Sequence, residues 1–279
     1  MTVLRGRAAT AAATAAIVAL CVSAAFAQRI WYGGYGYTPP RFPTKESFKG
    51  SFNFCRAMFQ SNRREKRGWS TDYPGADLNF STRLAELTKA PVTLRSDAEE
   101  GEVPDAVVVR LTDAALFRCP YILMEDAGTA VFSPQEAIQL REYFLKGGFA
   151  FVSDYWGDYA REQFDEEIAK ALPRSEFPTI DLPLNHPIWH TLFELKEIPQ
   201  MPSIQSWRRT NGNTDRGVDD PPSARGIADS RGRLMVVMMH NTDIPDGWER
   251  EGEDPEYFYR FSPDAYAVGI DIMLYAMTH

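Results

Sequence analysis

Several stretches of the chain are apolar at every position, and amphipathic stretches with helical spacing lie between them. Neighbouring residues of a strand point to opposite sides of its sheet, so continuous apolar stretches indicate strands covered on both faces. Strands of this kind that alternate with helices predict a parallel sheet between two layers of helices. The apolar stretches occupy residues 107–109, 120–124, 149–152 and 234–239.

The pattern therefore predicts an α/β fold with a three-layer, doubly wound and mostly parallel sheet. Its clearest helix begins at Ser133, where Pro134 and Glu136 complete a capping box, and ends at Gly147-Gly148. Similar spacing predicts helices at residues 52–64, 78–87 and 162–172 and a last helix begun by Ser262-Pro263. Residues 29–32 are expected to form a first strand that ends at Gly33-Gly34.

One segment, from about residue 208 to residue 233, does not fit this alternation. It contains four glycines, two prolines and many charges, without apolar periodicity. A loop of this length is usually a lid, a binding loop or a disordered insert. Residues 28–279 are expected to form a single α/β domain that includes this loop.

The first 27 residues have the features of a secretory signal peptide. Arg5 and Arg7 precede a small apolar stretch at residues 8–25, and Ala25-Phe26-Ala27 offers a cleavage site. Cleavage there leaves 279 − 27 = 252 residues without another long apolar stretch. We therefore expect an exported protein, periplasmic or otherwise outside the cytoplasm, with no transmembrane span in its mature chain.

The acidic composition limits the partners of the protein. The formal charge is −8, and loss of Arg5 and Arg7 makes it −8 − 2 = −10. This charge argues against nucleic acid or an anionic membrane surface as the main partner. Cys55 and Cys119 remain after cleavage. An oxidising compartment permits a disulfide between them, while two buried free thiols fit the sequence equally well.

Polar residues follow the predicted strands directly. In an open parallel sheet, ligands bind beyond the carboxyl ends of the strands, so these residues are the candidates for a site. The acidic Asp154 is the central one, because a carboxylate at this edge can meet solvent and ligand. The others are Gly33 and Gly34, Glu125 and Asp126, Tyr155 and Trp156, and His240, Asn241 and Asp243.

A second group of candidates comes from the scarce histidines. His186 precedes Pro187, and with Asp154 and His240 it would form an acid–base or metal-type constellation. Alternatively the histidines bond loop carbonyls and Asp154 caps a turn. Four tryptophans in loops offer faces for sugars or are simply half buried, namely Trp156, Trp189, Trp207 and Trp248.

Familiar catalytic motifs are absent from the sequence. It has no Gly-x-Ser-x-Gly elbow, no P-loop, no Gly-x-Gly-x-x-Gly after a strand and no Cys-x-x-Cys. No motif therefore requires a cofactor, and the sequence leaves metal binding open.

Five segments follow one another along the chain, namely WSTDYPGADLNFSTRLAELT at 69–88, PYILMEDAG at 120–128, GGFAFVSD at 147–154, His186-Pro187-Ile188 and HNTDIPDGW at 240–248. Their order resembles a bacterial family, domain of unknown function 4159. The resemblance implies a class I glutamine amidotransferase-like, flavodoxin-like fold. More distantly, the Gly-Gly turn, the His-Pro segment and Gly232-Arg233 before a strand are similar to trehalose-utilisation-like proteins.

In amidotransferases of this fold, the turn after the fourth strand carries the nucleophilic Cys. Asp154 stands at the matching position here, so amidotransferase activity is not expected, because no thiolate is available there. Members of the resembled family are often encoded with envelope proteins and AAA-type ATPases, which implies an envelope protein as a partner.

Three hypotheses follow. The first is an exported, non-catalytic or weakly catalytic domain that binds a small polar, carbohydrate-like ligand or an envelope partner. The second is a hydrolase or isomerase acting on a sugar-like substrate, with Asp154 as base and His186 or His240 as acid or metal ligand. The third is a structural domain whose polar groups are satisfied internally.

Overall fold

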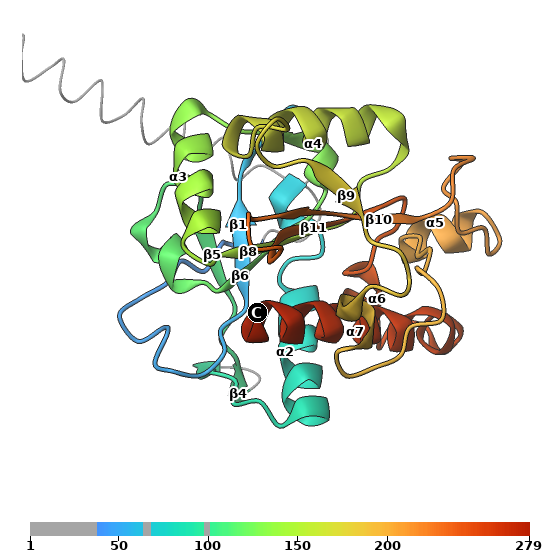
Figure 1. Ribbon diagram of the computed structural model, residues 1–279. Coiled ribbons are helices and arrows are strands. Elements are labelled where there is room, and N and C mark those ends of the chain that lie inside the picture. The colour runs from blue at the N-terminus through green and yellow to red at the C-terminus, as the bar shows by residue number, and fades with distance from the viewer. Residues whose placement is uncertain (1–37, 64–67, 98–100) are drawn as a thin grey trace, which may run out of the picture. The chain divides into compact units, whose positions relative to one another are not determined.

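The computed structural model describes residues 38–63, 68–97 and 101–279 (Figure 1). Residues Pro40–His279 form one compact unit. The expected signal peptide, the strand expected at residues 29–32 and the site candidates Gly33 and Gly34 lie outside the described residues. Across the described ranges, no helix has the length and apolar character needed to cross a membrane.

A seven-stranded sheet lies at the centre of this unit, with strand order β5-β1-β6-β8-β11-β10-β9. The five strands from β5 to β11 are parallel, and β10 runs antiparallel to both of its neighbours. This confirms the predicted α/β architecture with a mostly parallel sheet. The strands are β1 (Cys55–Met58), β5 (Val107–Arg110), β6 (Tyr121–Met124), β8 (Phe149–Val152), β9 (Thr179–Asp181), β10 (Ser223–Ala228) and β11 (Leu234–His240).

Helices cover both faces of the sheet (Figure 1). On one face lie α3 (Pro134–Leu145) and α4 (Gly157–Ala171), and on the other α2 (Gly75–Thr88), α6 (Asp246–Glu249) and α7 (Pro255–Thr278). The smaller elements are α5 (Ile204–Arg209), the pairs β2 (Gln60–Ser61) with β7 (Ala130–Val131) and β3 (Leu94–Asp97) with β4 (Gly101–Pro104), and the short helices η1 (Gly68–Ser70), η2 (Ala114–Arg118), η3 (Ala127–Thr129) and η4 (Pro187–His190).

Strand β8 shows why the strands are apolar throughout. Ala150 and Val152 pack with the residues of α3 and α4, while Phe149 and Phe151 pack with those of α2 and α7. Successive side chains of a strand alternate between faces, so a strand between two helical layers needs apolar residues at every position. The continuous apolar pattern is therefore the signature of the layered fold.

The predicted start and end of α3 are confirmed. Ser133 accepts a hydrogen bond from the Glu136 N–H, and the Glu136 carboxylate accepts from the Ser133 N–H. At the other end Gly147 has φ +106°, which favours glycine. A Cβ on Gly148 would lie 2.4 Å from the Tyr143 ring, so the turn into β8 also requires a residue without a side chain there.

The helix expected at residues 52–64 is wrong, because the structure places β1 and β2 there. Residues at helical spacing in this stretch are apolar, but so are their neighbours Phe54 and Ala57. Only Arg56 interrupts the apolar pattern of β1, and its side chain is fully buried. Because a charged residue interrupts this buried strand, the hydrophobic pattern did not predict a strand here.

The last helix begins earlier than predicted. Asp254 caps it by accepting hydrogen bonds from the N–H groups of Glu256 and Tyr257, and Pro263 lies inside it. Pro263 is exposed, and so is Tyr259 one turn earlier, so Pro263 lies on the solvent side of the helix.

The segment expected to be a loop at about 208–233 is in part regular. It includes the end of α5 and all of β10, so the irregular parts are residues 210–222 and the turn at residues 229–233. Strand β10 was missed because Arg225 and Gly226 stand at its centre. Arg225 forms an ion pair with Asp165 of α4, and a Cβ on Gly226 would contact Leu234 and Leu182.

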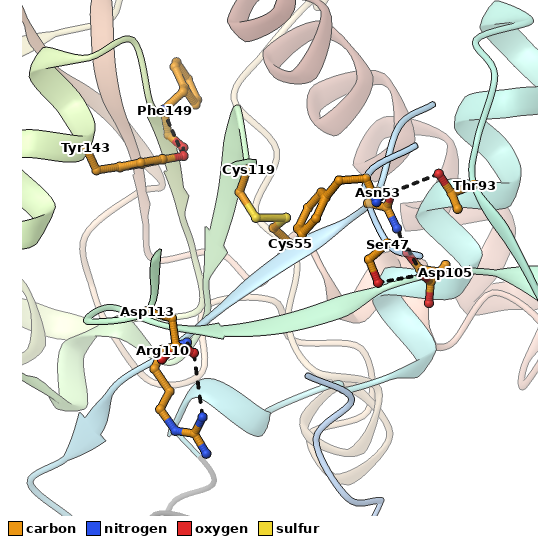
Figure 2. The surroundings of a disulfide bond; sticks show 11 residues. Ser47, Asn53, Cys55, Thr93, Asp105, Arg110, Asp113, Cys119, Tyr143 and Phe149 are labelled. Atoms are coloured by element: carbon orange, nitrogen blue, oxygen red, sulfur yellow. Dashed lines mark hydrogen bonds and ion pairs between the residues drawn. A yellow bond between two sulfur atoms is a disulfide. The ribbon is translucent and has the colours of Figure 1, made fainter. Parts of the chain in front are cut away.

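A disulfide joins Cys55 in β1 to Cys119, just before the neighbouring strand β6 (Figure 2). Their Cα atoms are 6.0 Å apart, and both residues are buried. The choice that the sequence left open is therefore resolved in favour of the bonded pair. Because the bond closes a loop with a sequence separation of 64 residues, it restricts the unfolded chain considerably.

We predict that reduction of the Cys55–Cys119 bond lowers the free energy of unfolding by about 4 kcal/mol, from the loss of the loop constraint. Urea unfolding of residues 28–279 with and without a reducing agent measures this change. A double variant, Cys55→Ala with Cys119→Ala, should respond to urea identically in both conditions. Equal stability of the oxidised and reduced wild-type protein would contradict the prediction.

Candidate functional site

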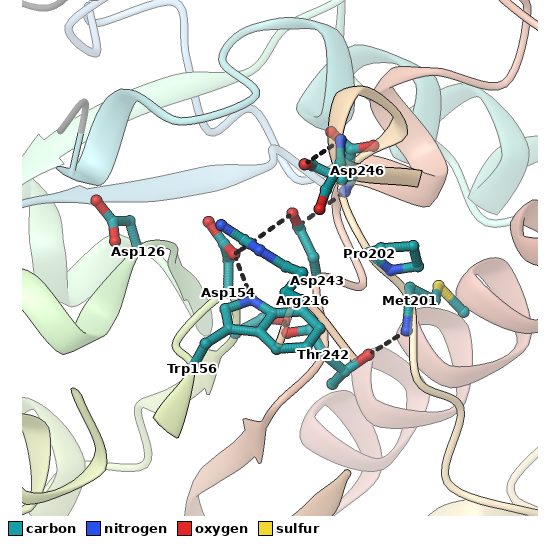
Figure 3. A network of polar contacts seen from close by, with 12 residues as sticks. Asp126, Asp154, Trp156, Met201, Pro202, Arg216, Thr242, Asp243 and Asp246 are labelled. Atoms are coloured by element: carbon teal, nitrogen blue, oxygen red, sulfur yellow. Dashed lines mark hydrogen bonds and ion pairs between the residues drawn. The ribbon is translucent and has the colours of Figure 1, made fainter. Parts of the chain in front are cut away.

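Acidic residues follow three parallel strands at one edge of the sheet. Glu125 and Asp126 come after β6, Asp154 comes after β8, and Asp243 comes after β11. Figure 3 shows Asp154 and Asp243 turned toward one another, with Asp126 set apart from them. The predicted gathering of carboxylates at the carboxyl edge is therefore observed for this part of the chain.

Backbone geometry turns the chain sharply where these strands end. Asp126, Asp154 and Asn241 have φ values of +47°, +50° and +56°. The left-handed region is unfavourable for most residues, but Asp and Asn adopt it more readily than others. These residue types therefore stabilise the turns and can bind a ligand as well. The two interpretations of Asp154, as a turn residue and as a site residue, are compatible.

Two further carboxylates reach this edge from the α2 and α6 side. Asp72 lies in the turn before α2, and Asp246 begins α6. Carboxylate oxygens of Asp72, Glu125 and Asp243 all lie within 4.8 Å of one another, and all three residues are buried. A second set, which shares Asp72, adds Asp246 and Glu249. We call Asp72, Glu125 and Asp243 the carboxylate triad.

Burial and mutual repulsion make these carboxylates hard to ionise. Burial is the main cause that raises the pKa of Asp72, Glu125 and Asp243 well above the ordinary range, and neighbouring carboxylates add to it. Burial also raises the pKa of Asp246 to about 7, although its carboxylate accepts hydrogen bonds from the Ile204 N–H and the Tyr257 hydroxyl. The site therefore favours protons or other cations.

Arg56 is the buried cation beneath this edge. Its guanidinium donates to both carboxylate oxygens of Asp77 in α2 at 3.0 Å and to Glu125 Oε2 at 3.0 Å. It also donates to the carbonyl oxygens of Trp69 and Thr71 at 3.1 and 2.7 Å. Arg56 thus fixes one oxygen of Glu125 and leaves the other, Oε1, without a hydrogen-bond partner among the described residues.

A second arginine covers the edge from the loop at residues 210–222. Arg216 donates to Asp154 Oδ1 at 2.9 Å and lies 3.9 Å from Asp243 Oδ2. Its guanidinium carbon is 4.8 Å from the centre of the Trp156 ring, and the indole N–H of Trp156 donates to the same oxygen of Asp154. A loop cation is therefore held between an aromatic face and two carboxylates (Figure 3).

The histidines have other partners. His240 Nε2 lies 3.0 Å from the Gly157 carbonyl oxygen, and His186 Nδ1 accepts from the Ile188 N–H beside α7. Burial lowers the pKa of both rings. Among the described residues, no hydrogen bond joins Asp154 to either ring. The acid–base constellation considered from the sequence is not assembled in this structure.

Several other candidates serve the fold. Tyr155 is buried against Phe164, and the Asn241 side chain accepts from the Gly157 N–H and donates to the carbonyl oxygens of Asp220 and Pro221. Trp248 is fully buried against aromatic rings of the core. Trp189 and Trp207 are buried too. The structure places Trp189, Trp207 and Trp248 in η4, α5 and α6 rather than in the loops expected, and of the four only Trp156 is partly exposed at the edge.

A family model for a domain of unknown function, DUF4159, matches residues 59–277. The chain belongs to the DUF4159 family. No curated protein matches it. The family resemblance proposed from the sequence is thereby confirmed. The family model covers the acidic residues of the site and Arg216, whereas Arg56 lies just before the matched range.

Sequence reasoning did not identify several residues of the site in this DUF4159 chain. Asp72 and Asp77 stand in the stretch TDYPGAD before and within α2, and Asp246 stands in HNTDIPDGW. Both stretches were recognised as family segments, but their acids were not assigned to the site. Arg56 and Arg216 gave no signal at all, because a lone arginine has no characteristic spacing.

The buried pair of Arg56 and Asp77 should be essential for stability. We expect Asp77→Asn to lower the free energy of unfolding by about 3–5 kcal/mol, because it leaves a buried guanidinium without its main counter-charge. Urea unfolding measures the change. The matched control is Glu142→Gln, which removes an exposed partner of Lys146 and should cost less than about 1 kcal/mol. Equal effects of the two substitutions would contradict the prediction.

The raised pKa of Asp246 predicts a pH-dependent stability. Between the ordinary value of 3.8 and about 7, the folded protein keeps a proton that the unfolded chain releases. The free energy of unfolding therefore falls as pH rises through this window. Asp246→Asn lacks this titration but can still accept hydrogen bonds. The variant should therefore gain stability relative to the wild type, by about 1.4 kcal/mol for each step of one in pH inside the window.

Urea unfolding at steps of pH in the presence of EDTA measures this difference. The control Asp181→Asn changes an exposed carboxylate of β9 and should stay within about 0.5 kcal/mol of the wild type at every pH. A difference between wild type and Asp246→Asn that does not vary with pH would show that Asp246 titrates normally.

Proposed function

We propose that this DUF4159 chain is an exported, non-catalytic ligand-binding domain that takes a small cationic, hydroxyl-bearing ligand, such as an amino sugar, at the carboxyl edge of its sheet. The observation that carries the proposal is the position of Arg216, whose guanidinium lies on the Trp156 ring and donates to Asp154. Because a positively charged loop side chain occupies this position, a ligand that replaced it would carry a positive charge and hydrogen-bond donors.

The surroundings of Arg216 indicate the class of ligand. A cation over an indole face is stabilised by the ring, and a carboxylate beside it adds a charge-assisted hydrogen bond. Asp154 and Asp243 would receive an ammonium group, and their free lone pairs would accept from hydroxyl groups. A neutral sugar is less well matched, because three of the four tryptophans considered as stacking faces are buried.

The loop at residues 210–222 is attached to the edge by few contacts. Besides Arg216, Thr214 bonds Gln200, and Asn241 bonds the carbonyl oxygens of Asp220 and Pro221. Asn211, Gly212, Arg216 and Gly217 all have positive φ, so the loop consists of tight turns rather than a regular element. A ligand that takes over the partners of Arg216 would need to move only this loop.

Two observations support an exported protein without catalysis. The Cys55–Cys119 disulfide is typical of proteins in oxidising compartments, which agrees with the signal peptide expected from the sequence. Asp154 is bonded to Trp156 and Arg216, and no described hydrogen bond joins it to a histidine, as the acid–base pair considered for catalysis would require. The described residues thus favour binding over the hydrolase or isomerase considered earlier.

Binding of glucosamine to residues 28–279 tests the proposal, measured by calorimetry in EDTA with glucose as the neutral comparison. We expect glucosamine to bind and glucose to bind at least tenfold more weakly. Arg216→Ala should tighten glucosamine binding several-fold, because it removes the internal competitor. Asp154→Asn should weaken it at least tenfold, because it removes the principal counter-charge.

The matched control is Arg231→Ala, which removes an exposed arginine from the turn before β11, at the other end of that strand. It should leave glucosamine binding unchanged. Equal affinities for glucosamine and glucose, or equal effects of Arg216→Ala and Arg231→Ala, would contradict the proposed role of the edge.

A further inference from the structure

We propose that the carboxylate triad, Asp72, Glu125 and Asp243, binds one hard divalent cation of the Ca²⁺, Mg²⁺ and Mn²⁺ class. The three residues come from separate parts of the chain, namely the turn before α2 and the ends of β6 and β11. The fold, rather than a local acidic run, brings them together at one buried point.

The spacing of the triad suits such an ion. Its three oxygen atoms lie within 4.8 Å of one another. Oxygen ligands of Mg²⁺ and Ca²⁺ lie at about 2.0–2.6 Å from the metal, so two ligands on opposite sides are at most about 5 Å apart. A set of three carboxylates without His or Cys favours hard cations over Zn²⁺ or Cu²⁺.

Unpartnered oxygens provide an independent indication. No described N–H or O–H donor bonds Asp72 Oδ2 or Glu125 Oε1, although the two residues are only 5% and 0% exposed; the two carboxyls lie within hydrogen-bond reach of one another. Buried polar atoms are almost always bonded, and two carboxylates can bond one another only when one carries a proton. A cation between them would satisfy both oxygens at once.

The neighbouring arginines do not take this place. Arg56 bonds Glu125 through Oε2 and so directs Oε1 away from itself, in the manner of an outer residue that orients a metal ligand. Arg216 is 3.9 Å from Asp243, but its hydrogen bond goes to Asp154. Neither guanidinium has a described hydrogen bond to Asp72. The triad is therefore flanked by positive charge but not filled by it.

The cation would bind at the same edge of the sheet as the proposed ligand. Its proposal rests on the proposed function only in taking this edge as the site. A metal in the triad would lie beside Asp243, which also faces Arg216. It could present its remaining coordination positions to hydroxyl groups of a ligand, since Ca²⁺ and Mg²⁺ accept additional oxygen donors.

Titration of the metal-free protein with Mn²⁺ and with Ca²⁺ alone tests the inference, by calorimetry and without any sugar. We expect one ion per chain. Glu125→Gln and Asp243→Asn should each weaken binding at least tenfold, because each removes one charged ligand. Asp181→Asn makes the same change of charge at an exposed position of β9 and should leave the affinity unchanged.

Arg216→Gln provides a second measurement that does not touch the triad. It removes a positive charge near Asp243 and should strengthen metal binding several-fold. Absence of binding to the wild-type protein, or binding that Glu125→Gln and Asp243→Asn leave intact, would overturn the inference. If either triad variant fails to fold, no strengthening in Arg216→Gln would overturn it as well.

The two proposals can fail separately. Glucosamine binding is measured in EDTA, and metal binding is measured without glucosamine. Metal binding without any response to glucosamine would support the metal site and refute the proposed ligand. Glucosamine binding without metal binding would refute the metal site alone.

Discussion

The buried guanidinium of Arg56 is the interaction on which the rest of this structure depends. It lies in the middle of β1, fully enclosed, and connects the sheet to Asp77 in α2 and to Glu125 after β6. Its bonds to the carbonyl oxygens of Trp69 and Thr71 also hold the turn that precedes α2. Removing a charge of this kind from water is costly, and only several simultaneous partners offset the cost. The strand, the helix and the acidic edge are therefore fixed relative to one another by one side chain.

The arrangement also explains how so many carboxylates coexist at one place. Buried acids repel one another and resist ionisation, as the raised pKa values of Asp72, Glu125 and Asp243 indicate. A fold tolerates such a group when nearby positive charge, protons or bound cations compensate it. Arg56 supplies a permanent positive charge from strand β1, and Arg216 supplies one from the loop at residues 210–222. Acidic groups that stability alone would not select are commonly found where a protein binds something.

The sequence predicted the layers of the fold better than it predicted the site. Continuous apolar strands and the cap at Ser133 depend on local patterns, and they were recognised correctly. The edge position of Asp154 and Asp243 followed from the topology of parallel strands. Arg56 and Arg216 could not be assigned, because their roles depend on partners far away in the chain. The strand β1 was mistaken for a helix for the same reason, since the charge that interrupts it is neutralised only in three dimensions.

The reversed direction of β10 has a consequence for how such a site can change. Ser223 at the start of β10 pairs with His240 at the end of β11, so the loop before β10 opens at the carboxyl edge. A parallel strand in its place would begin at the opposite edge of the sheet, and the loop before it would open there. The antiparallel direction of β10 thus places a loop with a basic residue, Arg216, over the acidic edge. Insertions or deletions in the loop at residues 210–222 would alter this basic cover while the pairing of the sheet stays the same.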